Sequence, residues 1–289
     1  MKKLLIVGCG DIALRALPQL ARNYQVFGLV RTVDQADRIA VLGATALLGD
    51  LDRPPSLQPL AFGADLVLHL APPEESGERD QRSANLIAAL SPRPPERLVY
   101  ISTSGVYGDC GGAWVDEDRP SAPQSPRGAR RVDAENTLFA WGRLAGVAVA
   151  VLRVPGIYAA ERLPLGLLKR GVPVLRAEDD VYSNHIHADD LASICSRALE
   201  RDAAGRAYNA SDDSEMKMGD YFDLVAERCG LPRPPRITRA AAEAGAISEG
   251  LLSFMRESRR LVNARMKAEL GVQLRYPSVR EGVPKIAAS

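Results

Sequence analysis

Short apolar runs alternate along the first half of the chain with segments in which apolar residues recur every three or four positions. The short runs predict strands, and the longer spacing predicts helices that bury one face. The predicted strands are residues 4–7, 25–31, 44–48, 65–70, 97–102 and 147–153. A strand followed by a helix, several times over, is typical of βαβ units that build a parallel sheet.

The helices predicted between these strands are residues 11–22, 35–42, 78–90 and 126–145. Pro18 lies inside the first of them, where it removes a backbone donor and is expected to kink the helix. The last one has clear boundary signals. Ser125 is expected to be its N-cap with Pro126 at the first helical position, and Gly146 is expected to end it.

After Pro155 the pattern loosens, as expected where a smaller lobe is built from returning segments. Residues 189–200 and 220–229 predict helices, and residues 207–210 predict a last strand. We therefore expect residues 1–155 to form a nucleotide-binding domain. Residues 156–289 are expected to return a strand and a helix to the sheet and to form a smaller substrate lobe.

Composition changes this picture little. The 289 residues are 46% hydrophobic and 25% charged, as in an ordinary globular protein, and the net charge of +1 gives no footprint for nucleic acid or an anionic membrane. The apolar run after Met1 stops at Gly8, too short for a signal or a membrane span. Four cysteines show no metal-type spacing. A reduced, cytoplasmic protein, monomeric or homodimeric, is expected.

The first candidate site is Gly8-Cys-Gly10-Asp-Ile-Ala13, which follows the first strand and opens the first helix. This is the context of the G-x-G-x-x-[GA] fingerprint for dinucleotides, in which glycines let the backbone approach a pyrophosphate at the helix N-terminus. Gly8, Gly10, Asp11 and Ile12 are therefore predicted to bind a cofactor. The fingerprint and the βαβ pattern predict an α/β Rossmann fold with a doubly wound parallel sheet. An ordinary glycine-rich turn is the alternative.

The end of the second strand distinguishes the two nicotinamide cofactors. An NAD site usually has an acidic residue there, about twenty residues past the glycines, to bind the ribose 2′-hydroxyl. This chain has Arg31 and Thr32 instead, with no acid before Asp34. A guanidinium pairs well with a 2′-phosphate. NADP is therefore expected, with NAD as the alternative, unless Arg31 is simply a solvated side chain.

Two segments carry a resemblance to a known family. Ser102-Thr-Ser-Gly-Val-Tyr-Gly108 ends the fifth strand, and Pro123-Gln-Ser-Pro-Arg-Gly-Ala-Arg-Arg131 opens the following helix. They resemble the S-[ST]-x-x-V-Y-G and P-x-S-P-Y-G-x-S-K segments of the extended short-chain dehydrogenase/reductases, the group of nucleotide-sugar epimerases and dehydratases. Arg127 stands where that family has its catalytic tyrosine, and Arg131 stands where it has a lysine.

The resemblance implies roles for further residues. Thr103 corresponds to the residue that holds the substrate oxygen, although a strand-end hydroxyl that satisfies backbone groups is an equal alternative. Gly49-Asp50-Leu51 resembles the segment that meets the adenine, and His69-Leu70-Ala71-Pro72 resembles the one that lines the nicotinamide ribose. Asp50, Leu51, Leu70, Ala71 and Pro72 are accordingly implied as cofactor contacts.

Arg127 cannot be the missing base, because a guanidinium stays protonated at physiological pH. It remains a candidate to bind an anion, polarise a carbonyl or anchor a phosphate. Alternatively, the helix start is solvated and Arg131 pairs with Glu135, one turn along. Positive charges in the first turns oppose the helix dipole, which disfavours that alternative. Tyr107 and Tyr158 are expected to pack rather than to replace the tyrosine.

His185-Ile-His187-Ala-Asp189-Asp190 suggests a metal site, but we expect none. The aspartates begin a predicted helix, where acids cap and complement the dipole, and His187 is expected to tie the turn to the core.

Two functions remain open. One is an NAD(P)-dependent oxidoreductase or epimerase-like enzyme acting on a small carbonyl or sugar-nucleotide substrate, with Thr103, Arg127 and Arg131 at its centre. The other is an inactive dinucleotide-binding sensor.

Overall fold

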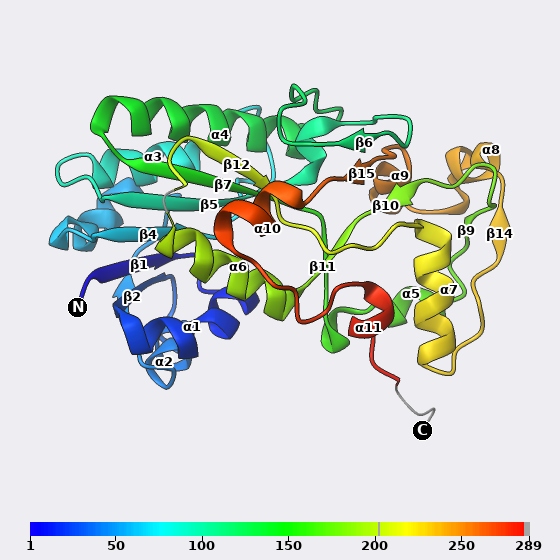
Figure 1. The fold of residues 1–289 in the computed structure, drawn as a ribbon, viewed down its shortest axis with the longest axis horizontal. Coiled ribbons are helices and arrows are strands. Elements are labelled where there is room, and N and C mark those ends of the chain that lie inside the picture. Colours follow the sequence, from blue (N-terminus) through cyan, green and yellow to red (C-terminus); the bar gives the residue numbers. More distant parts are fainter. Residues whose placement is uncertain (202, 286–289) are drawn as a thin grey trace.

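Seven parallel strands form the central sheet of the computed structural model, which describes residues 1–201 and 203–285 (Figure 1). Their order across the sheet is β12-β7-β5-β4-β1-β2-β3. The strands are β1 (Lys3–Val7), β2 (Gln25–Val30), β3 (Thr45–Leu48), β4 (Leu66–His69), β5 (Arg97–Thr103), β7 (Ala148–Val154) and β12 (Arg206–Asn209). Every pairing is parallel, which confirms the predicted doubly wound α/β fold.

Helices cover both faces of this sheet (Figure 1). They are α1 (Asp11–Asn23), α2 (Val33–Ala40), α3 (Gln81–Leu90), α4 (Pro126–Ala145) and α6 (Ala188–Glu200). In β1 the side chains of Leu4 and Ile6 pack with α1 and α6, while those of Leu5 and Val7 pack with α3 and α4. The strand is apolar throughout because alternate residues enter two different cores.

Local signals place most element boundaries correctly. Ser125 caps α4 by accepting the Gly128 N–H at 3.1 Å, and Gly146 ends the helix with a φ of 72°. The helix expected from residue 78 begins only at Gln81, because Asp80 accepts the Ser83 N–H as its N-cap. The α1 helix continues through Pro18 to Asn23, with the proline on its exposed side.

The remaining segments build a second, smaller body with its own apolar core (Figure 1). Its strands are β8 (Gly156–Tyr158), β9 (Val174–Leu175), β10 (Tyr182–Ser183), β11 (His185–His187), β13 (Met216–Lys217) and β14 (Arg236–Ile237). Its helices are α5 (Leu165–Lys169), α7 (Met218–Arg228), α8 (Arg239–Ala241), α9 (Glu249–Met255) and α11 (Val279–Gly282).

The chain passes between the two bodies several times. After β11 it returns to the sheet as α6 and β12, beside which α10 (Ala264–Leu270) lies. The β6 strand (Trp114–Val115) pairs with β15 (Arg260–Leu261), so the loop after β5 is held against the second body. Short 3₁₀ helices occupy residues 54–62, 104–107 and 160–162, and a π-helical turn occupies residues 242–246. Within the described ranges, no helix is long and apolar enough to cross a membrane.

Candidate functional site

A cavity of about 280 Å³ opens where β1, β2, β3 and β4 end. The carboxyl edge of a parallel sheet is the usual place for a ligand in this architecture. Most of the predicted cofactor contacts line the cavity, namely Gly8, Gly10, Arg31, Asp50, Leu51, Leu70, Ala71 and Pro72. Leu29, Gln35 and Arg82 also line it and were missed, because they belong to no motif. Cys9 lines it too, at a position of the glycine fingerprint that accepts any residue.

The glycine turn after β1 fits a dinucleotide. Gly8 has a φ of +93°, and a Cβ atom there would lie 2.5 Å from the backbone nitrogen of Ala71. At Gly10, by contrast, a Cβ atom would meet nothing within 4 Å. Gly10 is the N-cap of α1 and offers no side chain to its first N–H groups. Those donors and the open space above Gly10 suit a pyrophosphate.

The side chains of three residues predicted to contact the cofactor do not line the first cavity. The Asp11 side chain faces a neighbouring hollow and pairs with Arg15 at 2.9 Å and Arg162 at 3.0 Å. Ile12 is buried in the core below α1. Thr32 caps α2, where its hydroxyl accepts the Gln35 N–H at 3.3 Å. Asp11 and Ile12 therefore have only their backbone N–H groups to offer a cofactor.

Arg31 lies one residue beyond β2, which ends at Val30 instead of at residue 31 as predicted. Its backbone N–H donates to the Gln35 side chain at 2.9 Å. Across the part of the chain that the structure describes, no hydrogen bond or ion pair holds its guanidinium. The other arginine of the cavity, Arg82, is already paired with Asp52 at 2.7 Å.

A second and larger cavity, of about 590 Å³, lies beyond the ends of β5 and β7 and reaches into the smaller body. The three predicted catalytic residues, Thr103, Arg127 and Arg131, all line it. The smaller body contributes side chains that the sequence did not assign to this site, among them Tyr182, His185, Tyr221, Phe254, Glu257 and Arg259. The cavity is thus assembled from residues more than 100 positions apart.

Thr103 ends β5 and its hydroxyl accepts the Gly105 N–H at 3.2 Å. This contact uses a lone pair, so the hydroxyl proton remains available to a substrate oxygen in the cavity. Ser102 is different, because it is only 2% exposed and donates to the carboxylate of Glu135 beneath the sheet edge. Of the two strand-end hydroxyls, Thr103 is the one that is placed to touch a substrate.

The Arg131 guanidinium does not pair with Glu135, which corrects the alternative of a solvated i,i+4 pair. It donates to the Tyr100 hydroxyl at 2.8 Å and to the Ile101 carbonyl at 2.6 Å. Its charge, together with complete burial, lowers the pKa of His69 to about 3, burial being the larger cause. His69 is therefore neutral and its Nε2 lies 3.0 Å from the Ser83 hydroxyl.

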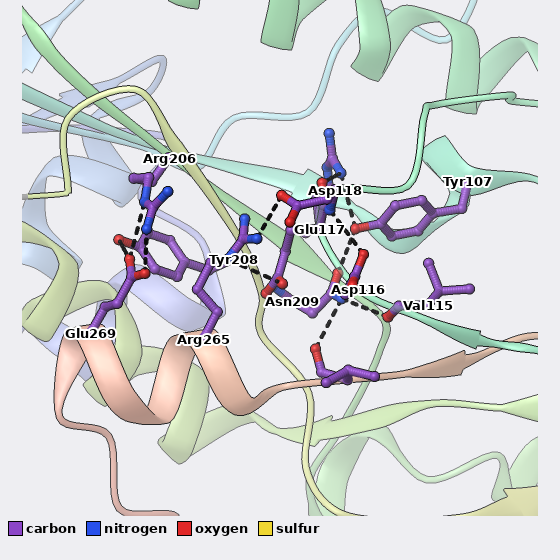
Figure 2. Close-up of polar contacts among 12 residues, drawn as sticks. Tyr107, Val115, Asp116, Glu117, Asp118, Arg206, Tyr208, Asn209, Arg265 and Glu269 are labelled. Atoms are coloured by element: carbon purple, nitrogen blue, oxygen red, sulfur yellow. Dashed lines mark hydrogen bonds and ion pairs between the residues drawn. The ribbon is translucent and has the colours of Figure 1, made fainter.

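Glu135 pairs instead with Arg153 of β7 at 2.8 Å, and both are buried. Arg153 also donates to the Tyr107 hydroxyl at 2.9 Å, which in turn donates to Asn209 at 2.8 Å. Asn209 is held further by Glu117, which accepts its backbone N–H at 2.7 Å (Figure 2). Tyr107 therefore packs below the cavity, as predicted.

Tyr158 is 1% exposed and donates to the Ser278 carbonyl at 3.2 Å, so it also packs as predicted. Burial raises the pKa of its phenol, with nearby Asp212 and Asp190 adding to the effect. Burial raises the pKa of Tyr107 as well, so both phenols are weaker acids than an exposed tyrosine.

Of the two histidines of β11, His187 has a structural part, whereas His185 lines the second cavity. His187 caps α6, since its Nδ1 accepts the Asp189 N–H at 3.1 Å. Asp190 does not cap the helix but accepts the N–H groups of Arg275 and Tyr276 at 2.8 and 2.9 Å. Among residues 1–201 and 203–285, no group of three or more His, Cys, Asp or Glu residues is arranged to hold a metal ion.

Comparison with known proteins agrees with this architecture. The model of the NAD dependent epimerase/dehydratase family matches residues 9–211. A putative UDP-glucose 4-epimerase of Methanocaldococcus jannaschii is 23% identical over 159 residues, which cover 51% of this chain and 52% of that protein. The chain thus spans about half the length of this curated relative.

A longer match is to a ketoreductase of Stigmatella aurantiaca, which acts on 4-hydroxy-2-methyl-3-oxo-4-farnesyl-3,4-dihydroquinoline-1-oxide. It is 24% identical over 269 residues, covering 85% of this chain and 80% of that protein. Among solved structures, a conserved protein of unknown function from Silicibacter pomeroyi superposes with a TM-score of 0.79. It is 30% identical, with 98% of this chain and 97% of that one covered.

Proposed function

Since the chain belongs to the NAD-dependent epimerase/dehydratase family, we propose that it is an oxidoreductase that uses NADP and acts on a small carbonyl or sugar-nucleotide substrate. The observation that carries this proposal is the arrangement of two cavities along one sheet edge. The first has the glycine turn of a dinucleotide site, and the second begins at Thr103. A nicotinamide cofactor supplies hydride chemistry to such a site.

In this proposal the first cavity holds the cofactor. The N–H groups at the start of α1 bind the pyrophosphate, and Gly8 keeps the turn close to Ala71. Asp50 and Leu51 flank the adenine, while Leu70, Ala71 and Pro72 flank the nicotinamide ribose. The family is named for its dependence on NAD, and the choice of NADP over NAD rests on Arg31 alone.

The second cavity positions the substrate. Thr103 donates a hydrogen bond from its hydroxyl group to the substrate oxygen, and Arg127 orients an anionic or carbonyl group of the substrate. Arg131 fixes Tyr100 and the end of β5 from the other side. Because a guanidinium does not release its proton, the proton exchanged with substrate comes from another group or from water.

Turnover is tested by incubating the purified protein with NADPH, then with NADH, and a panel of ketones, aldehydes and keto-sugar nucleotides. Saturable oxidation of NADPH with one substrate class is the expected result. Cofactor binding without any turnover would favour the inactive dinucleotide-binding protein, and failure to bind either cofactor would contradict both.

Cofactor choice is tested by Arg31→Ala. Loss of a charge-assisted pair with the 2′-phosphate is expected to weaken NADP binding about 10- to 100-fold and to leave NAD binding within about twofold. Both dissociation constants are measured by fluorescence titration. Arg22→Ala, at an exposed site near the end of α1, is the matched control. An Arg31→Ala variant that keeps its preference for NADP would remove the basis of the assignment.

A further inference from the structure

The second cavity has an excess of positive charge that the cofactor does not explain. Four arginines line it, Arg127, Arg131, Arg162 and Arg259, and Glu257 is the acidic residue of its lining. The phosphates of a dinucleotide would be held at the glycine turn, by the first cavity. Arg162 is paired with Asp11 at 3.0 Å and Arg259 with Glu257 at 2.8 Å, so Arg127 and Arg131 carry the charge that no acid among the described residues neutralises. This charge is available to another anion.

Arg127 is the least committed of them. No hydrogen bond or ion pair joins its guanidinium to any residue within 1–201 and 203–285. Its guanidinium carbon lies 4.5 Å from the centre of the Phe254 ring. A cation–π contact of this kind uses no N–H group as a hydrogen-bond donor, so the donors of Arg127 stay available to a ligand.

Arg259 reaches the cavity from the segment before β15. Through Nη1 it donates to the Gly108 carbonyl at 2.6 Å and to Glu257 at 2.8 Å. Its side chain is otherwise under-used, because Nε is buried without an acceptor and Nη2 makes no hydrogen bond to the described residues. Arg259 as a whole is 9% exposed, and water does not readily reach its buried Nε.

The charges affect one another. Partial burial of the Arg127 guanidinium lowers its pKa, and the positive charges of Arg131, Arg259 and Arg130 lower it further. Glu257 alone acts in the opposite direction. Arg131 adds to the excess because its own acceptors, a phenol and a carbonyl, are neutral. A bound anion would relieve this repulsion.

We propose that the second cavity selects substrates that carry an oxyanion, a carboxylate or a phosphate, and that Arg127 and Arg259 bind it. This inference rests on the proposed function, whose substrate class it narrows. Planar guanidinium groups match two oxygens of such an anion at once. Since Arg127 comes from α4 and Arg259 from the segment between α9 and β15, the anion would also join the two bodies across the cavity.

The probes are malonate and inorganic phosphate, titrated calorimetrically into the full chain with saturating NADPH and at constant ionic strength. Malonamide, which has the shape of malonate without its charge, is the ligand control. The anion that binds more tightly distinguishes a carboxylate site from a phosphate site. Binding of either anion, with none of malonamide, is the expected result.

Variants then locate the binding. Arg127→Gln and Arg259→Gln are each expected to weaken anion binding at least about tenfold. Arg143→Gln, an exposed arginine in the last turn of the same α4 helix, is expected to leave it within about twofold. Arg127→Gln breaks no hydrogen bond, so it tests the site even if Arg259→Gln fails to fold.

Equal binding of the anions and malonamide would overturn the inference, as would unchanged anion binding by both arginine variants. NADPH titration of the same samples separates the two proposals. If the unmodified chain binds NADPH but no anion, only the oxyanion site is contradicted. If it does not bind NADPH, the proposed function is contradicted.

Discussion

Single residues at the sheet edge differ in what they tolerate, although they belong to one motif. Gly8 adopts a φ of +93° against the backbone of Ala71, so any side chain there strains the fold. Gly10 has a φ of −86° with open space where its Cβ would be. Gly8 is required for the backbone to fold in this turn, whereas Gly10 is expected to be required only for the cofactor to bind.

Gly10→Ala is therefore expected to keep the thermal midpoint within a few degrees while weakening cofactor binding at least about tenfold, because the methyl group enters the space above the helix N-terminus. Gly8→Ala is expected to lower the thermal midpoint and to weaken cofactor binding. Differential scanning fluorimetry and cofactor titration measure the two effects. Normal cofactor binding by Gly10→Ala would show that no dinucleotide approaches this turn.

At the scale of elements, a buried ion pair joins α4 to the sheet. Glu135 forms an ion pair with Arg153 of β7 at 2.8 Å and accepts a hydrogen bond from Ser102 of β5. The pair therefore sets where α4 lies on the two strands whose ends form the second cavity. Arg127 and Arg131 begin the same helix, so their positions depend on this contact.

Glu135→Leu is expected to lower the free energy of unfolding by about 3–5 kcal/mol, because Arg153 would stay buried without a counter-charge. Adding Arg153→Met should recover part of the loss. The exposed Arg197–Glu200 pair is the control, and Glu200→Ala should cost no more than about 1 kcal/mol. Urea denaturation measures all three variants. Equal losses for Glu135→Leu and Glu200→Ala would refute this role.

At the scale of the whole molecule, buried histidines link folding to pH. Burial, aided by Arg131, lowers the pKa of His69 to about 3, and burial lowers that of His185 to about 4. In the unfolded chain each histidine takes up a proton below the ordinary histidine pKa of 6.5, whereas in the folded chain it stays neutral until the pH approaches its lowered pKa. Stability is therefore present above pH 6.5 and falls as the pH drops towards 4.

His69→Gln should flatten this fall, which is at most about 1.4 kcal/mol per pH unit for each histidine. Asp212 acts in the opposite direction, since burial raises its pKa to about 7 and the folded state holds the extra proton. Asp212→Asn should therefore steepen the fall. Chemical denaturation at pH 7, 6, 5 and 4 measures the slopes, and an unchanged slope in His69→Gln would contradict the assignment.

Sequence signals that act over a few residues were reliable. The Ser125 cap, the Gly146 end of α4 and the glycine turn after β1 all stand where the pattern predicted them. The side-chain partner of Arg131 was not predictable in this way. Local spacing offered its i,i+4 neighbour Glu135 as the alternative partner, but in the structure Arg153 of β7 pairs with that carboxylate.

The sequence by itself determined the parallel sheet, the dinucleotide turn and the absence of the usual tyrosine, because periodicity, capping and a motif are written in adjacent residues. Only the tertiary structure decided what surrounds Arg127. Phe254 and Arg259 come from more than 120 residues away and carry no local pattern. Their approach depends on how the smaller body packs against the sheet edge, where long-range burial, not local propensity, decides which charges meet.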